Sequence, residues 1–245
     1  NAEYGAAIST TLSFFMNDKY QKFLLKFTRF SRNPEKLARE ISRKSFHLLG
    51  AFAAIPIRLC SQKLIKLCGL CCLGFSLLEF TLELILLHSP SLNKFFLQYL
   101  SFLMRAEEAT QLSGVPSLFC GVGLNLLFLT KPAIEYGIYS LFLGDACAAL
   151  AGIGFGKLKI CGKKTLAGLL GCFGVCLWLT ALLGRMNVGI AAVSAIVELL
   201  CGQWIKINDN FVIPVVSGML FEGAGLKVRV GETVWFLREL AGRFK

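Results

Sequence analysis

Apolar runs of about 17 to 25 residues recur along the chain and are separated by short polar links. A helix needs about 20 apolar residues to cross roughly 30 Å of hydrocarbon, whereas a soluble chain shows shorter amphipathic elements. The pattern therefore predicts an all-α membrane bundle with about six or seven transmembrane segments. The expected segments cover residues 48–59, 67–87, 112–130, 132–155, 166–183, 188–205 and 211–224.

Both ends of the chain are expected to lie along the membrane surface. Residues 12–30 alternate aromatic and basic side chains, which is typical of a basic amphipathic helix in the interface. The last residues of the chain, in the tail 225–245, also have the pattern of a basic amphipathic helix. Because no internal repeat or linker is visible, we expect one transmembrane domain, 46–224, flanked by an interfacial region, 1–45, and a basic tail, 225–245.

Composition and charge support this assignment and set the orientation. Hydrophobic residues make up 55% of the chain and charged residues 17%, with a net charge of +11 and a mean hydropathy of +0.64. The basic residues cluster beside apolar runs, which favours anionic headgroups or nucleotide phosphates over nucleic acid as partners. The positive-inside rule places the polar groups with candidate functions on the cytoplasmic face. The basic tail would then lie outside unless segment 211–224, which is short for a crossing, is re-entrant; we favour the re-entrant form.

The fourth segment carries an acid and a row of small residues on one face. Asp145, Ala148, Ala149, Gly152 and Gly156 follow one another at helical spacing. Such a row either packs tightly against another helix or admits a bulky ligand to the backbone. A packed glycine face needs no carboxylate, and an acid within a membrane is costly. The presence of Asp145 therefore favours the interpretation that this face binds a ligand.

A lysine-rich link follows this segment, with Lys157, Lys159, Lys163 and Lys164 preceding Thr165. It is either a positive-inside anchor or part of a phosphoryl-transfer site, in which lysines neutralise phosphate oxygens and a carboxylate holds Mg²⁺. The link contains no Walker A loop.

Further acids lie toward helix ends. Glu79 and Glu83 are one turn apart, and Glu198 lies eleven residues before Asp209, so each pair can share a face. Acidic pairs in a bilayer suggest a cation. Glu135 stands alone and is interpreted as an interfacial polar residue.

Several motifs, in their order along the chain, resemble the family of dolichol kinase, phytol kinase and the CTP-dependent diacylglycerol kinase. They are Arg43-Lys44-x-x-His47, Arg105-x-x-Glu108 with Ser113-Gly114, Gly144-Asp145-x-x-Ala148 with Gly152 and Gly156, Lys164-Thr165 with Gly168, and Glu198 ahead of Asp209-Asn210 and Pro214. The resemblance spans about residues 43–218. It implies an integral membrane kinase that uses Mg²⁺ and moves the γ-phosphate of CTP to an isoprenoid alcohol such as phytol, dolichol or another polyprenol. Diacylglycerol is the alternative acceptor, and a lipid or ion-coupled transporter is the alternative from another class.

The resemblance also implies roles for individual residues. The catalytic candidates are Asp145, Lys164, Arg43, Lys44 and Glu108. The nucleotide-binding candidates are Gly152, Gly156, Lys157, Lys163, Thr165, Gly168 and Arg105. The metal candidates are Asp145, Glu108 and Asp209, and the lipid-site candidates are His47, Ser113, Gly114, Glu83, Glu198 and Asn210. Two positions depart from the family: Ala167 replaces an acid, and Leu86 or Leu87 stands where an arginine is usual.

Overall fold

The computed structural model of the chain describes Leu37, Glu40, Ile41, Lys44, Ser45 and residues 48–93, 111–201 and 207–225. Several predictions lie outside these residues. They concern the amphipathic regions at both chain ends, and the candidates Arg43, His47, Arg105 and Glu108.

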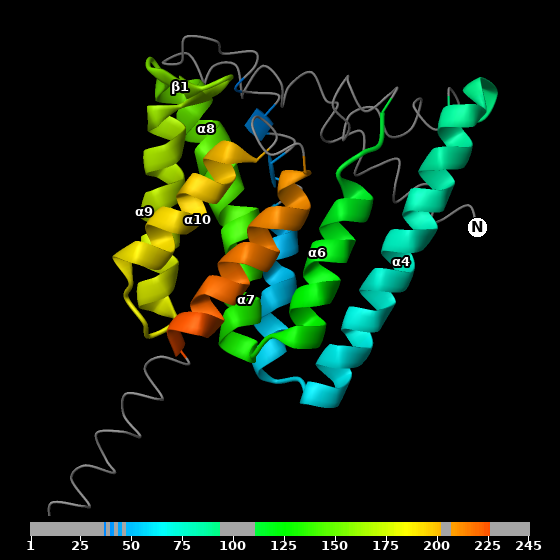
Figure 1. Ribbon diagram of the computed structural model, residues 1–245, viewed down its shortest axis with the longest axis horizontal. Coiled ribbons are helices and arrows are strands. Elements are labelled where there is room, and N and C mark those ends of the chain that lie inside the picture. Colours follow the sequence, from blue (N-terminus) through cyan, green and yellow to red (C-terminus); the bar gives the residue numbers. More distant parts are fainter. Residues whose placement is uncertain are drawn as a thin grey trace, which may run out of the picture.

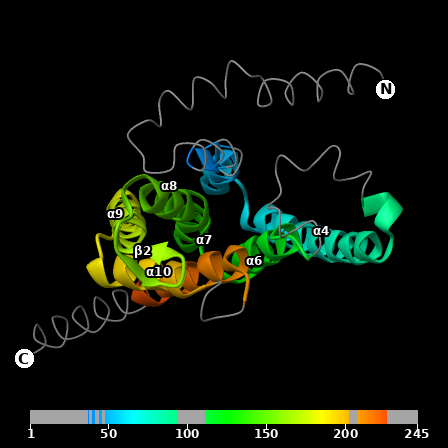
Figure 2. The same cartoon turned by 90° about the horizontal axis from the view of Figure 1, so that it is seen from above.

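The described residues form a bundle of helices that run up and down between two ends (Figure 1). The labelled helices are η1 (Gly50–Arg58), α4 (Gln62–His88), α6 (Val115–Phe128), α7 (Lys131–Tyr139), α8 (Asp145–Phe155), α9 (Leu166–Leu182) and α10 (Val188–Leu200). Residues 209–225 form a further helix, called the final helix below. Seen from above, α10, the final helix, α6 and α4 follow one another in a row, with α9, α8, α7 and η1 alongside (Figure 2).

The all-α prediction is confirmed for most of the described chain. Two helices are long and apolar enough to cross a membrane, Gln62–His88 and the continuous Lys131–Phe155. Three shorter apolar helices, α6, α9 and α10, accompany them. α4 stands at the edge of the bundle and exposes large apolar side chains such as Leu67, Leu70 and Leu78, as a lipid-facing helix would (Figure 1).

The lysine-rich link is not the simple loop that the sequence predicted. It forms a small antiparallel β-hairpin with strands β1 (Lys159–Cys161) and β2 (Lys164–Thr165). Gly162 in the turn has φ of 54°, a left-handed conformation that glycine adopts without steric cost. The hairpin lies at one end of the bundle, called the hairpin end below (Figure 1).

The segment predicted to be re-entrant, residues 211–224, belongs to one continuous helix. The final helix is continuous and runs from the hairpin end to the opposite end, so it does not return to the end where it begins (Figure 1). Close contacts hold it in place: Asn125 Nδ2 on α6 donates to the carbonyl of Pro214 at 2.9 Å, and a Cβ on Gly218 would lie 3.2 Å from the carbonyl oxygen of Ala133 on α7. Tight packing therefore fixes the direction of this helix within the bundle.

Glu135 is also not the lone interfacial residue that the sequence predicted. Its side chain is only 3% exposed, and Arg58 Nε lies 2.9 Å from each of its carboxylate oxygens. This ion pair joins the end of η1 to α7 at the end of the bundle opposite the hairpin (Figure 1). Buried carboxylates need such a partner, and sequence distance hid it because the two residues are 77 positions apart.

Candidate functional site

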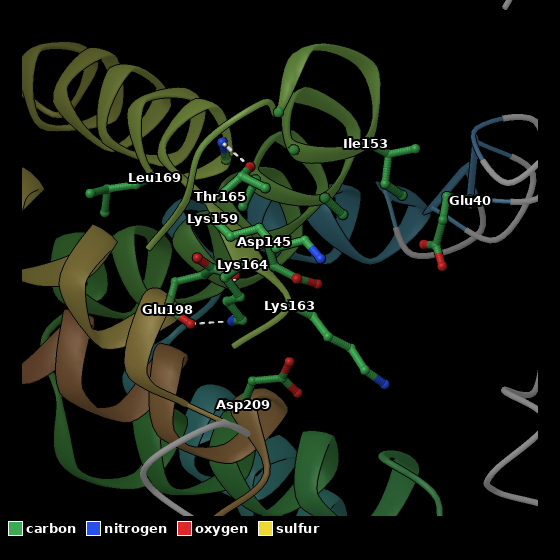
Figure 3. A pocket seen from close by; sticks show the side chains of 15 residues that line it. Glu40, Asp145, Ile153, Lys159, Lys163, Lys164, Thr165, Leu169, Glu198 and Asp209 are labelled. Atoms are coloured by element: carbon green, nitrogen blue, oxygen red, sulfur yellow. Dashed lines mark hydrogen bonds and ion pairs between the residues drawn. The ribbon is translucent and has the colours of Figure 1, made fainter. Parts of the chain in front are cut away.

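A charged cavity of about 360 Å³ opens at the hairpin end (Figure 3). This volume lies within the range of small-molecule sites, about 300–1,000 Å³. Its lining combines acids, lysines and small residues from five helices and the hairpin. The charged residues are Glu40, Asp145, Glu198, Asp209, Lys159, Lys163 and Lys164, and the uncharged ones include Ala148, Ala149, Gly152, Gly156, Thr165 and Gly168.

Asp145 begins α8, directly after a π-helical segment, Ser140–Gly144. Such wide turns inside α-helices are frequent at functional sites. The Asp145 carboxylate forms an ion pair with Lys44 Nζ, and Lys44 is only 1% exposed. The two charges are 101 residues apart in the sequence and neutralise each other in a buried place.

A second ion pair lies on the other side of the cavity. Lys164 on β2 reaches Glu198 on α10, with 2.7 Å between Nζ and Oε1, and it also donates to the Glu198 backbone carbonyl. Asp209, at the start of the final helix, points toward the same space, and Glu40 faces it from the other side (Figure 3). Four acids and four lysines, including Lys44, thus meet around one cavity.

The glycines have a packing role, which the sequence left open. A Cβ on Gly168 would lie 2.8 Å from the backbone carbonyl oxygen of Ala148, so α9 and α8 pass in direct backbone contact. A Cβ on Gly156 would lie 2.6 Å from Thr165 Oγ1, and one on Gly152 would lie 3.1 Å from the same atom. Thr165 Oγ1 in turn accepts from the Gly168 N–H at 3.2 Å and caps α9. These small residues therefore seat α9 against α8, and through that contact they form one wall of the cavity.

Four lipid-site candidates form a separate polar cluster at the same end. Ser113 donates from its backbone N–H to Glu83 at 2.9 Å, and its hydroxyl donates to the same carboxylate. Asn210 Nδ2 donates to the carbonyl of Gly114 at 3.2 Å. These bonds join α4, α6 and the final helix, and Asn210 adjoins Asp209, which links the cluster to the cavity. None of the four residues lines the cavity itself.

The structure thus brings together most of the predicted site that it describes. The predicted residues on the cavity wall are Asp145, Lys163, Lys164, Thr165, Asp209, Gly152, Gly156 and Gly168. Lys157 is exposed and does not line the cavity, and Glu198 lies with Lys164 rather than with the lipid-site cluster.

Sequence reasoning missed Glu40, and it placed Lys159 in the lysine-rich link without assigning it a role in the site. Glu40 lies one helical turn before Lys44, so the i, i+4 spacing was the available signal. Lys159 belongs to a strand that was interpreted as a loop, and for this reason its direction was not considered.

The donor set suits a cation that arrives with a ligand. Among the described residues, no group of three or more His, Cys, Asp or Glu side chains could hold a metal ion. Mg²⁺ is usually held by one or two carboxylates together with substrate phosphates and water, which the separate carboxylates of the cavity match. No known protein family, curated protein or solved structure matches the chain.

Proposed function

We propose that the protein is a membrane kinase that transfers the γ-phosphate of CTP, bound with Mg²⁺, to the hydroxyl of an isoprenoid alcohol. The observation that carries this proposal is the cavity itself, in which carboxylates and lysines alternate around a small-residue wall at one end of an apolar bundle. CTP and the isoprenoid acceptor follow from the resemblance to the dolichol kinase family. Diacylglycerol remains the alternative acceptor.

The lysines and the carboxylates of the cavity would have different roles in phosphoryl transfer. Lys159 and Lys163 would contact phosphate oxygens, and Asp145, together with Glu198 or Asp209, would hold Mg²⁺. The cation, when bound, neutralises charge that develops on the phosphates. Because this reaction asks for little covalent chemistry from the protein, positioning and electrostatics supply most of the acceleration.

The place of the cavity suits a lipid acceptor. The hydroxyl of a membrane alcohol lies at the interface between hydrocarbon and water, and the cavity opens at the end of helices whose outer faces are apolar. The acceptor oxygen would attack the γ-phosphorus in line, forming a new O–P bond as the bond to the β-phosphate oxygen breaks, and the hydroxyl proton would pass to water or to a carboxylate of the cavity. CDP and the lipid phosphate are the products.

The test uses the full chain, purified in lipid nanodiscs, with γ-labelled CTP and Mg²⁺. A polyprenol or diacylglycerol is supplied in the nanodisc, and labelled lipid phosphate is measured. Asp145→Asn should abolish the transfer, whereas Lys66→Gln, an exposed position on α4, should leave it unchanged. No labelled lipid with either acceptor, or full activity in Asp145→Asn, would refute the kinase.

A parallel series with γ-labelled ATP tests the nucleotide. A kinase that prefers CTP should yield several-fold more lipid phosphate from CTP at low concentration, and a preference for ATP would correct the donor without removing the kinase.

A further inference from the structure

Two carboxylates of the cavity are each held by a lysine. Asp145 pairs with Lys44, and Glu198 pairs with Lys164 at 2.7 Å. Both carboxylate side chains are less than 10% exposed, at 9% and 6%. Two candidate cation ligands on the cavity wall are therefore neutralised by two lysines, of which Lys164 lines the cavity and Lys44 lies buried against Asp145.

These pairs oppose the binding of a metal ion alone. A divalent cation that approaches Asp145 is repelled by the ammonium of Lys44. Because Lys44 and Asp145 are buried, water screens this repulsion only weakly. If the lysine moves away without a new partner, a buried ammonium is left unpaired, which is also costly. Phosphate alone meets the matching obstacle, because moving Lys44 away takes its positive charge from the buried Asp145 carboxylate.

We propose that Mg²⁺ and nucleotide bind to this cavity together by ion-pair exchange. Lys44 and Lys164 leave their carboxylates for phosphate oxygens, and Asp145, with Glu198, takes the cation that the phosphates bring. Each charge exchanges one partner for another, so none is left unpaired. The inference rests on the proposed function for the identity of the anion. It predicts that the pairs hold the site closed to free metal.

The test measures Mn²⁺ binding without nucleotide, a readout that needs no turnover. Free Mn²⁺ is followed by electron paramagnetic resonance in the presence of the full chain. The wild type should bind Mn²⁺ weakly, and Lys44→Met should bind it about ten-fold more tightly or better, because the ammonium that faces Asp145 and repels the cation is gone. The same variant should bind CTP with Mg²⁺ about ten-fold more weakly, since a phosphate contact is lost. The two affinities thus move in opposite directions.

Lys159→Met is the matched control. Lys159 lines the same cavity, and no ion pair of its side chain occurs among the described residues. Its removal should weaken CTP binding but leave Mn²⁺ binding unchanged. An equal gain in Mn²⁺ affinity in Lys159→Met would mean that general loss of positive charge, and not ion-pair exchange, controls the cation.

Lys44→Met leaves Asp145 buried without its lysine and is expected to unfold more easily. Mn²⁺ should raise the unfolding temperature of Lys44→Met. The double variant Lys44→Met/Asp145→Asn should be more stable than Lys44→Met, and Mn²⁺ should not change its unfolding temperature. Mn²⁺ affinity that is equal in wild type and Lys44→Met would overturn the inference, as would a response of the double variant equal to that of Lys44→Met. The kinase proposal fails separately, by the absence of labelled lipid phosphate.

Discussion

The contact between α8 and α9 offers the sharpest test of how the site is built. In Gly168→Ala, the new Cβ would lie 2.8 Å from the backbone carbonyl oxygen of Ala148. A backbone atom, unlike the end of a flexible side chain, moves only with its helix. The substitution must therefore push the start of α9 away from α8, and Thr165, which caps α9 through the Gly168 N–H, moves with it.

The expected cost follows from two opposed effects. Overpacking in a close helix contact costs about 1–3 kcal/mol. Alanine is favoured over glycine by up to about 1 kcal/mol inside a helix, and less in the first turn where Gly168 lies. We expect Gly168→Ala to lower the free energy of unfolding by about 1–2 kcal/mol. Nucleotide affinity should fall as well, because Thr165 and Lys164 move with the start of α9.

Gly174→Ala on the same helix is the matched control. A Cβ at Gly174 meets nothing within 4 Å, and the position is exposed. The substitution therefore changes only the intrinsic helix propensity, which is higher for alanine than for glycine. This variant should be as stable as the wild type or more stable by up to about 1 kcal/mol. Unfolding in detergent micelles, followed by circular dichroism, measures both variants. If Gly168→Ala unfolds no earlier than Gly174→Ala, the backbone contact between α8 and α9 is refuted.

Three other predictions concern parts of the bundle away from this contact. Arg58→Ala should lower the free energy of unfolding by about 1–3 kcal/mol, because buried Glu135 loses its partner. The affinity for CTP should stay unchanged. If the lost ion pair is the cause, Arg58→Ala/Glu135→Gln should recover part of the lost stability in the same unfolding assay. Ser113→Ala should lower the free energy of unfolding by about 1 kcal/mol, because its hydroxyl donates to Glu83 and accepts from the Val115 N–H. In the transfer assay, a higher KM for the lipid with unchanged KM for CTP would support a lipid contact, and two unchanged KM values would leave Ser113 with a structural role alone. Epitopes inserted at the turns of Gly162 and Gly184 should be bound by antibody from opposite sides of sealed vesicles, and binding from the same side would contradict a crossing by α9.

The helices were the most predictable part of the fold, because long apolar runs carry their own signal. The run 166–183 became Leu166–Leu182, and the run 132–155 became the continuous helix Lys131–Phe155. The hairpin was missed because two strands of three and two residues are too short to establish an alternating pattern. The prediction for the final helix rested on its length and on the charge of the tail. Its close packing at Gly218 could not be predicted, because a single glycine does not indicate which helix it contacts.

The site was predictable in composition but not in pairing. Asp145 stood out because a charge in an apolar segment is costly, Lys164 because it belongs to a lysine-rich link, and Asp209 through the family resemblance. The structure brings the three to one cavity. Nothing local to Asp145 indicated that Lys44 would be its partner. Such pairs depend on how distant helices pack, which a single sequence does not report.

The position of the cavity at a helix end has a physical reason that joins the fold to the proposed chemistry. Charges near the middle of a bilayer are the most costly to place, whereas those at helix ends can reach water, ions and headgroups. A lipid hydroxyl lies at the same depth, so a protein that must bring phosphate to this group is best built with its charges there. The two lysine–carboxylate pairs reduce the cost further while no ligand is bound, and they keep both kinds of charge within reach of the cavity. The pairing that lowers the cost of burying these charges in an apolar bundle is therefore the same pairing that would let them exchange partners with a metal-bound nucleotide.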